Sequence, residues 1–189
     1  MVAELLRRLR RVPDRMLHGS RRRAALASLA ARPKPATILV LCNGNIFRSP
    51  FAAAVLRRTV GSSGIRVESA GLIGPGRPSP PDAVAAAAER GIDLSTHRSR
   101  LVTSELVRAA DLIVAMDPLQ HRVVREHFGR APRDIVFLGD LDPEPAASRA
   151  IEDPVEQGPE VCGRVYTRIE RCVTELVRAL GRPRSARVT

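Results

Sequence analysis

Aromatic residues are scarce in this chain of 189 residues, which contains no tryptophan, one tyrosine and four phenylalanines. The hydrophobic core must therefore be built from alanine, valine, leucine and isoleucine. No run of residues approaches the roughly 20 apolar positions of a membrane-spanning helix. Cysteine is also rare: there are three, an odd number without metal-ligand spacing, which argues against both a disulfide framework and a metal centre. We expect a cytoplasmic protein with no metal and no cofactor, in which Cys162 and Cys172 are inert thiols buried in a final helix.

Acidic residues are outnumbered, with 20 Asp and Glu against 31 Lys and Arg, giving a net charge of +11. The excess lies mainly in residues 1–36, where ten basic residues face two acidic ones for a net charge of +8. The remainder is only mildly basic and lacks the alternation of aromatic and basic residues found in RNA-binding modules. A nucleic-acid partner is therefore not expected for the main domain.

Residues 1–35 form a basic N-terminal extension whose composition differs from the rest of the chain. Residues 5–12 predict a short basic amphipathic helix that Pro13 ends or bends, and we expect the extension to be otherwise flexible. A contact with anionic lipid, a contact with an acidic partner and a solvated tail all remain open, as does a true start at Met16. Ser20–Arg23 resembles a twin-arginine export signal, but the apolar run that follows is only eight residues long, so export is rejected.

From residue 37 the pattern alternates strands with helices. Strands are predicted at Thr37–Leu41, Ile65–Ser69, Leu112–Ala115 and Ile135–Phe137, and helices near residues 50–60, 80–90, 103–109, 118–128 and 159–180. This alternation predicts an α/β fold, a doubly wound four-stranded parallel sheet with helices on both faces. We place the domain at residues 36–182, followed by a C-terminal tail of residues 183–189. In such sheets, ligands bind beyond the carboxyl ends of the strands.

Residues 42–49, CNGNIFRS, connect the first predicted strand to the first predicted helix of this domain. Backbone N–H groups in such a loop converge on an anion, and the dipole of the following helix adds positive potential. Both effects favour the thiolate form of Cys42, which makes it a nucleophile. The guanidinium of Arg48 offers a planar fork for two phosphoryl oxygens. The loop therefore predicts a phosphate cradle with a nucleophile at its base.

This loop, continued by Pro50, resembles the C-x-G-N-x-x-R-S-P motif of the low-molecular-weight protein tyrosine phosphatases. Four further segments match the family in order and spacing, so that the resemblance covers roughly residues 36–181. They are Ser69–Gly71, Gly91–Leu94 with His97 and Arg98, Ala110–Asp117, and Ile151–Pro154.

The resemblance implies metal-independent hydrolysis of phosphotyrosine through a cysteinyl-phosphate intermediate, on the flavodoxin-like fold of that family. It implies Cys42 as the nucleophile, with Arg48 binding the equatorial oxygens of the phosphoryl group. Ser49 would hydrogen-bond the sulfur, although a helix N-cap is an equally ordinary role for serine. Ser69 and His97 match the residues that hold the loop asparagine, here Asn45. The full predicted phosphate-binding loop is Asn43, Gly44, Asn45, Ile46, Phe47, Arg48 and Ser49.

The general acid implied by the resemblance is Asp153, which would protonate the leaving oxygen and later activate water. Asp140 and Asp142 lie in the same acidic region, and Asp142-Pro143 is a competing Asp-Pro pair. The isoleucine two residues before Asp153, and the distance to the last helix, favour Asp153.

Three departures from the family pattern bear on specificity. Val155-Glu156-Gln157 stands where most relatives place aromatic residues against the substrate ring. Phe47 occupies the position of a second loop cysteine that can form a protective disulfide in many relatives. Ile46 replaces the small hydroxyl residue of the phosphoarginine branch.

Two other functions remain as alternatives. One is an arsenate reductase of the same fold, but its relay cysteines are expected within residues 117–135, which contain none. The other is a phosphoprotein-binding module without catalysis. For a phosphatase, the resemblance implies a phosphotyrosine-containing protein as partner, such as a bacterial tyrosine kinase of exopolysaccharide export.

Overall fold

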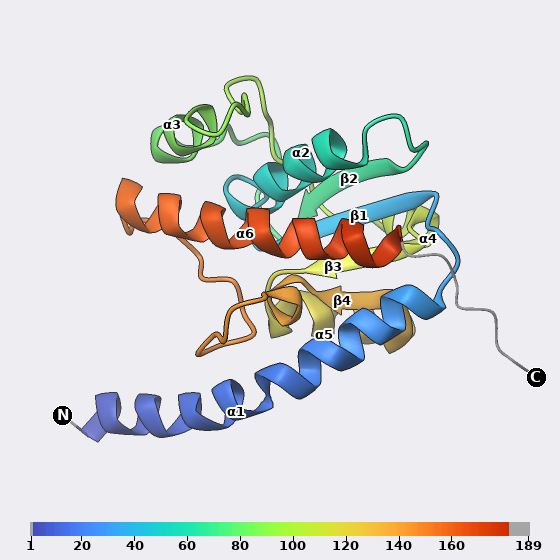
Figure 1. The fold of residues 1–189 in the computed structure, drawn as a ribbon. Coiled ribbons are helices and arrows are strands. Elements are labelled where there is room, and N and C mark those ends of the chain that lie inside the picture. The colour runs from blue at the N-terminus through green and yellow to red at the C-terminus, as the bar shows by residue number, and fades with distance from the viewer. Residues whose placement is uncertain (1, 182–189) are drawn as a thin grey trace, which may run out of the picture.

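The computed structural model describes residues 2–181, with side chains from residue 14 onward. Its centre is a sheet of four parallel strands in the order β2-β1-β3-β4, as Figure 1 shows. The strands are β1 (Thr37–Cys42), β2 (Arg66–Gly71), β3 (Leu112–Ala115) and β4 (Ile135–Phe137). The predicted α/β fold and all four predicted strands are confirmed, with β2 running two residues further than expected.

Helices cover both faces of this sheet (Figure 1). They are α2 (Arg48–Val60), α3 (Pro81–Ala88), α4 (Ser104–Ala109), α5 (Pro118–Glu126) and α6 (Pro159–Leu180). Two short 3-10 turns flank β4, η1 (Pro132–Asp134) and η2 (Leu138–Leu141). All five helices predicted for the domain are present. Within residues 2–181, none of the helices has the length and apolar character required to span a bilayer.

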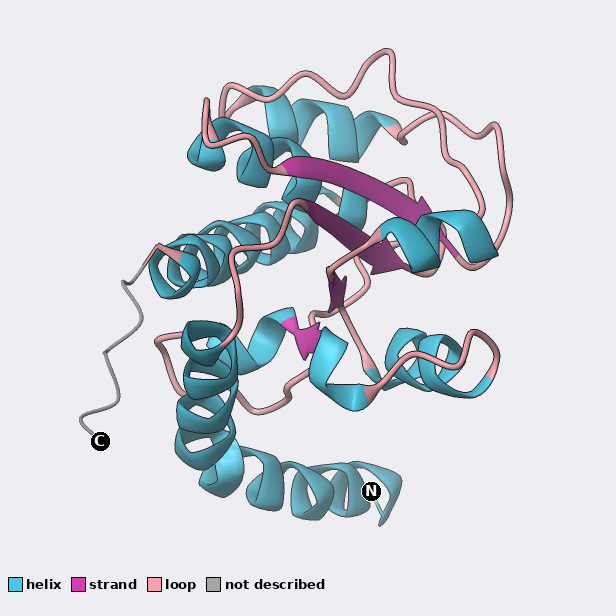
Figure 2. Ribbon diagram, turned by 90° about the vertical axis from the view of Figure 1, so that its right-hand side faces the viewer, coloured by secondary structure: helices cyan, strands magenta, loops and turns pink. Residues whose placement is uncertain are grey.

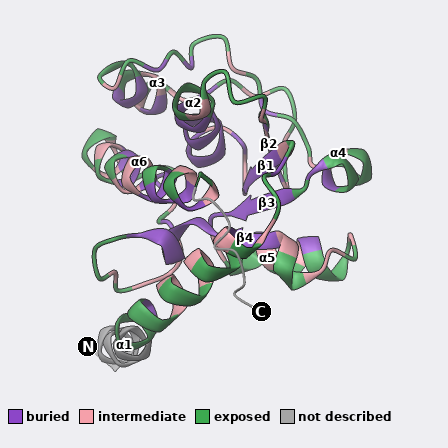
Figure 3. Ribbon diagram, turned by 45° about the vertical axis from the view of Figure 1, so that its right-hand side comes forward, coloured by how far each residue is buried: buried purple, intermediate pink, exposed green. Residues whose placement is uncertain are grey.

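Alternation along β1 divides the core into two layers. Ile38 and Val40 pack toward α2 and α6, while Leu39 and Leu41 pack toward α4 and α5. All four side chains are essentially inaccessible to solvent, as expected for a central parallel strand covered on both faces. Figure 3 shows the buried residues concentrated on the sheet and on the inner faces of α2 and α6.

The N-terminal extension differs from its prediction. It forms one helix, α1 (Val2–Ala31), which continues through Pro13 and bends part-way along its length (Figure 2). Its second half is held by tertiary contacts that the sequence pattern did not reveal. Leu29 is 2% exposed, His18 Nε2 donates to the backbone oxygen of Asp142 at 3.0 Å, and Arg22 pairs with Glu175 of α6. Packing against α6 and η2 therefore extends the helix beyond what local propensity predicts.

Candidate active site

The loop between β1 and α2 begins at Cys42, directly beyond the carboxyl end of a central strand. The side chain of Cys42 is 2% exposed. Its Sγ accepts a hydrogen bond from the backbone N–H of Asn45 at 3.2 Å and is hydrogen-bonded to Ser49 Oγ at 3.0 Å. Both contacts stabilise negative charge on the sulfur.

Asn45 is the residue that fixes the shape of this loop. Its backbone has a φ of 50°, in the left-handed region that asparagine tolerates better than most residues. Its Nδ2 donates to Ser49 Oγ at 2.9 Å and to Ser69 Oγ at 3.0 Å. Its Oδ1 accepts from the backbone N–H of Arg100 at 3.0 Å, which sets the orientation of the amide. The Asn45 amide donates to Ser49 Oγ, so the hydroxyl proton of Ser49 remains available to another acceptor. The nearer acceptor is the sulfur of Cys42 at 3.0 Å, and the backbone oxygen of Ala70 lies at 3.5 Å.

Serine 49 lies inside α2 rather than at its N-cap. The N-cap of α2 is Phe47, whose side chain makes no capping bond. The alternative interpretation of Ser49 as a cap is therefore wrong, because its hydroxyl is engaged by Cys42 and Asn45. Phe47 is 5% exposed, and its backbone oxygen accepts from the hydroxyl of Tyr166 in α6 at 3.2 Å.

His97 lies where the sequence placed it, against Asn45. Its Nε2 donates to the backbone oxygen of Asn45 at 2.7 Å. Burial lowers the pKa of His97, and the bond to Asn45 only partly opposes that shift. The neutral imidazole is therefore the form that the loop favours.

The end of β2 approaches the loop so closely that only glycine fits there. A Cβ on Gly71 would lie 2.8 Å from the backbone oxygen of Asn43 and 2.9 Å from the backbone nitrogen of Asn45. The next residue, Leu72, donates its backbone N–H to the same Asn43 oxygen at 2.7 Å. This packing explains why glycine follows Ser69-Ala70 at the end of β2.

Arg48 is the best-buried charged group at the site, at 2% exposure. Its Nη1 donates to the backbone oxygen of Ile151 at 2.9 Å and lies 3.4 Å from Asp117 Oδ2, and its Nη2 pairs with Asp153. Its Nε is buried without a hydrogen-bond partner. A buried guanidinium with an unused donor is a group that an oxyanion can satisfy.

Of the three acidic candidates near the site, only Asp153 contacts Arg48. Its side chain is 37% exposed, which leaves it open to a substrate. Asp140 instead pairs with Arg149 at 2.5 Å. Asp142 is fully buried between Arg168 and Arg171.

The pKa of Asp142 argues against a role as proton donor. Burial alone would raise this pKa, but hydrogen bonds from Arg171, the backbone N–H of Glu144 and Arg168 hold it below its usual range. Asp142 is therefore an ionised structural anchor, since a general acid must be protonated when the leaving group departs.

Two residues at the site, Asp117 and Arg77, carry roles that the sequence analysis did not assign. Asp117 caps α5 through a capping box with Gln120 and also faces Arg48. Arg77 Nη2 donates to the backbone oxygen of Gly44 at 3.1 Å. The Asp117-Pro118 step was a readable helix-start signal, but nothing in the sequence marks Arg77.

The other two thiols are separate from this chemistry. Cys162 and Cys172 are fully buried in α6 and are not paired. Burial raises their pKa values to about 11 and about 12. The prediction that they are inert buried thiols agrees with these environments.

Comparison with known proteins identifies the domain. Residues 37–186 match the model of the low molecular weight phosphotyrosine protein phosphatase family. The chain belongs to this family. A probable low molecular weight protein-tyrosine-phosphatase, EpsP of Ralstonia nicotianae, is 41% identical over 107 residues, covering 56% of this chain and 72% of EpsP. The protein is thus a protein-tyrosine-phosphatase.

Solved structures of two phosphatases are similar to this one. The tyrosine phosphatase Wzb from Escherichia coli K30, in complex with sulphate, matches with a TM-score of 0.69 and 27% identity, covering 77% of this chain and 98% of that one. The YwlE arginine phosphatase from Geobacillus stearothermophilus matches with a TM-score of 0.68 and 28% identity, covering 76% and 92%. The fold therefore accommodates phosphatases of two substrate classes.

Proposed function

We propose that this phosphatase hydrolyses phosphotyrosine in proteins through a cysteinyl-phosphate intermediate and without a metal ion. The observation that carries the proposal is the placement of Arg48. It is nearly fully buried, its Nε has no partner, and it lies in the loop that starts at Cys42 while contacting Asp153. The proposal assigns the nucleophile to Cys42, the anion-binding group to Arg48 and the acid to Asp153.

In the first step, Cys42 Sγ attacks phosphorus as a thiolate while the bond from phosphorus to the tyrosyl oxygen breaks. Asp153 takes up a proton from solvent once the substrate has displaced it from Arg48, and gives that proton to the departing oxygen. The phosphoryl oxygens take the place of the Asp153 carboxylate on Arg48, whose guanidinium binds more strongly as charge spreads in the transition state.

In the second step, water attacks phosphorus and the bond to Cys42 Sγ breaks, releasing inorganic phosphate. Asp153, now a carboxylate, takes a proton from the attacking water. Ser49 donates its hydroxyl proton in a hydrogen bond to the departing sulfur, consistent with their 3.0 Å separation. Asn45, Ser69 and His97 position the loop without taking part in bond changes.

The surroundings of the site favour an aryl phosphate. Three exposed apolar side chains adjoin site residues: Ile73 donates its backbone N–H to Asn43 and is 51% exposed, Leu119 is 41% exposed and Val155 is 44% exposed. Leu119 and Val155 each lie two residues after an aspartate that faces Arg48. An aliphatic rim can pack against a phenyl ring, although less specifically than the aromatic wall of most relatives.

The biological setting follows from the family and from the N-terminal helix. We propose the cytoplasm as location and a phosphotyrosine protein, such as a bacterial tyrosine kinase, as partner. We also propose that residues 36–182 form the catalytic domain and that α1 is an addition to it. Anionic lipid and an acidic protein both suit the basic first half of α1, while the domain itself offers nothing specific to nucleic acid.

The test is hydrolysis of para-nitrophenyl phosphate in EDTA by the parent protein, Cys42→Ser, Asp153→Ala and the control Glu152→Ala. Glu152 is a neighbouring half-exposed acid that pairs only with Arg164 in the described residues. We expect no turnover for Cys42→Ser, a fall of about 10²–10⁴-fold for Asp153→Ala, and near-parent rates for Glu152→Ala. A phosphotyrosine peptide should be cleaved in preference to a phosphoarginine peptide.

Other outcomes would support the alternatives. A folded parent protein that binds vanadate but does not turn over substrate would indicate a phosphoprotein-binding module. Turnover that depends on added metal would overturn the proposed mechanism. Faster cleavage of the phosphoarginine peptide would leave the mechanism in place and change the substrate class.

A further inference from the structure

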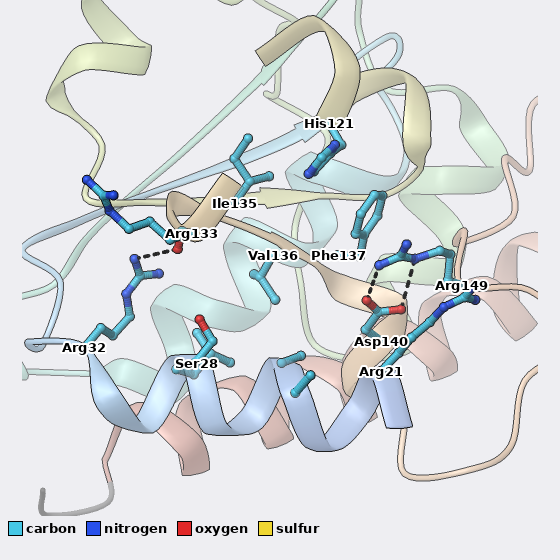
Figure 4. Close-up of a pocket in the computed structure, with 13 residues that line it drawn as sticks. Arg21, Ser28, Arg32, His121, Arg133, Ile135, Val136, Phe137, Asp140 and Arg149 are labelled. Carbon is cyan, nitrogen blue, oxygen red and sulfur yellow. Dashed lines mark hydrogen bonds and ion pairs between the residues drawn. The ribbon is translucent and has the colours of Figure 1, made fainter. Parts of the chain in front are cut away.

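A cavity of about 230 Å³ lies between α1 and β4 (Figure 4). Its lining comes from α1 on one side and from η1, β4 and η2 on the other. Cys42, Arg48 and Asp153 do not contribute to it. Because α1 precedes the residues that match the family model, one wall of this cavity is built by an element outside the family domain. We call it the α1–β4 pocket.

Arginines occupy both ends of the α1–β4 pocket, as Figure 4 shows. Arg32 and Arg133 lie at one end, and Arg21 and Arg149 at the other. Asp140 is the single acidic residue in the lining, and it is already paired with Arg149 at 2.5 Å. The lining thus carries more positive than negative charge.

The end formed by Arg32 and Arg133 is the less neutralised of the two. Arg32 Nη2 donates to the backbone oxygen of Arg133 at 3.1 Å and lies 3.8 Å from Asp134. In the part of the chain whose side chains are described, no carboxylate forms an ion pair with Arg133. Burial lowers the pKa of Arg32, although Asp134 opposes the shift, so this charge is poorly solvated. The guanidinium of Arg133 points away from the cavity in Figure 4, so Arg32 supplies the donors at this end. Its remaining N–H groups suit a carboxylate, sulfonate or phosphate headgroup.

The interior of the α1–β4 pocket is apolar. Leu29, Ile135 and Val136 line it and are between 2% and 9% exposed. The ring of Phe137 is covered by His121, with centroids 4.8 Å apart, and by the guanidinium of Arg149 at 3.7 Å. This surface accepts hydrocarbon, and the cavity volume is below the roughly 300–1,000 Å³ typical of drug-sized ligands.

We propose that the α1–β4 pocket binds a small organic anion with a flat apolar body. The body lies against Leu29, Val136 and the edge of Phe137, and the acidic headgroup binds Arg32. This proposal does not depend on the chemistry at Cys42. It gives α1 a role in ligand binding as well as in covering the open edge of the sheet at β4.

The test is isothermal titration calorimetry of the full chain with 2-naphthalenesulfonate, with orthovanadate present to saturate the loop at Cys42. We expect one saturable site. Arg32→Gln should weaken binding about tenfold, because the charge-assisted hydrogen bond to the headgroup is lost. Ser28→Leu should weaken it at least as much, because Ser28 is exposed on α1 and faces the cavity in Figure 4.

Matched controls distinguish binding in this pocket from non-specific effects of charge and hydrophobicity. Arg66→Gln removes an exposed arginine on β2, at the opposite edge of the sheet, and Ser28→Ala removes the hydroxyl without filling the space. Both should bind like the parent protein. Neutral 2-naphthalenemethanol should bind at least tenfold more weakly than the sulfonate. The proposal is overturned by the absence of saturable binding, by equal losses in Arg66→Gln and Arg32→Gln, or by equal binding of the neutral alcohol.

Discussion

The two loops that meet at Arg48 are held in opposite ways. The phosphate loop, residues 42–49, is fixed along its whole length by neighbouring segments: Asn45 alone bonds to Ser49, Ser69 and the backbone of Arg100. The acid segment, residues 142–157, is fixed at its start and open near Asp153. The functional cysteine of the first segment is buried, whereas the functional aspartate of the second is 37% exposed.

The difference matches the tasks of the two loops in the proposed mechanism. A nucleophile must be held in line with phosphorus, whereas the acid must release Arg48 to the substrate and then approach the leaving oxygen. Within the acid segment, Asp142 has no exposed surface and anchors the segment. Asp153 is 37% exposed and is the residue proposed to act in the chemistry. The following variants test the positioning of the phosphate loop and of the acid segment.

Replacement of Arg48 by lysine should give the largest effect, because both loops depend on it. Lysine keeps the charge but loses the planar fork that bonds Ile151 and Asp153 together. We expect kcat to fall about 10²–10³-fold, the loss typical of a removed transition-state donor. Steady-state kinetics on para-nitrophenyl phosphate measure this, and a loss smaller than tenfold would show that a point charge suffices.

Asp142→Asn should lower the free energy of unfolding and leave the catalytic rate unchanged. Removing the buried carboxylate leaves Arg168 without its anion and Arg171 with only the exposed Glu144, which costs about 3 kcal/mol of unfolding free energy. Urea denaturation measures the loss, and kcat of the folded fraction should stay near that of the parent protein. Glu144→Gln, which removes an exposed partner of Arg171, is the control and should change stability little.

The pH dependence of the Asp142→Asn effect provides a second check. The folded-state pKa of Asp142 lies below its ordinary value, so its contribution is present above the unfolded-state pKa of about 3.9 and is lost as pH falls through the folded-state value. The gap between parent and variant should therefore narrow in acid. A gap that stays constant down to the acid limit would contradict the ion-pair explanation.

The smallest expected effect concerns His97 and the rigidity of the phosphate loop. Since its folded-state pKa is lowered below about 6.5, the unfolded chain binds the proton more readily. Stability should decline as pH falls from about 6.5 through the folded-state pKa, and then level off. His97→Gln should lose this pH dependence of stability while keeping a donor toward Asn45. Identical profiles of stability against pH for the parent protein and His97→Gln would rule out this role of His97.

Much of the phosphate loop was predictable because its contacts are short in sequence or belong to a recognisable motif. Cys42, Asn45 and Ser49 lie within eight residues, and the alternation of strand and helix fixed which sheet edge they occupy. The sequence neighbours of Asp153 favoured it over Asp142 as the general acid. The structural reason, the pair of arginines around Asp142, could not be predicted from the sequence. Arg168 and Arg171 are 26 and 29 residues away along the chain.

The N-terminal helix shows the limit of local patterns. Pro13 correctly signals a disturbance, yet α1 continues because its second half has tertiary partners on α6 and η2. His18 and Leu29 are buried there, although the surrounding arginines suggested a solvated tail. Arg77 was unpredictable for the same reason: its bond to Gly44 joins segments 33 residues apart.

The stacking of Tyr166 on Phe51, at 3.7 Å between nearly parallel rings, has an optical consequence. The chain has no tryptophan and no other tyrosine, so its ultraviolet fluorescence above the phenylalanine range comes from this one ring. The Tyr166 hydroxyl bonds the backbone oxygen of Phe47, inside the phosphate loop. The unmodified protein therefore carries a single native fluorophore attached to its catalytic loop, and its emission reports on that loop without any label.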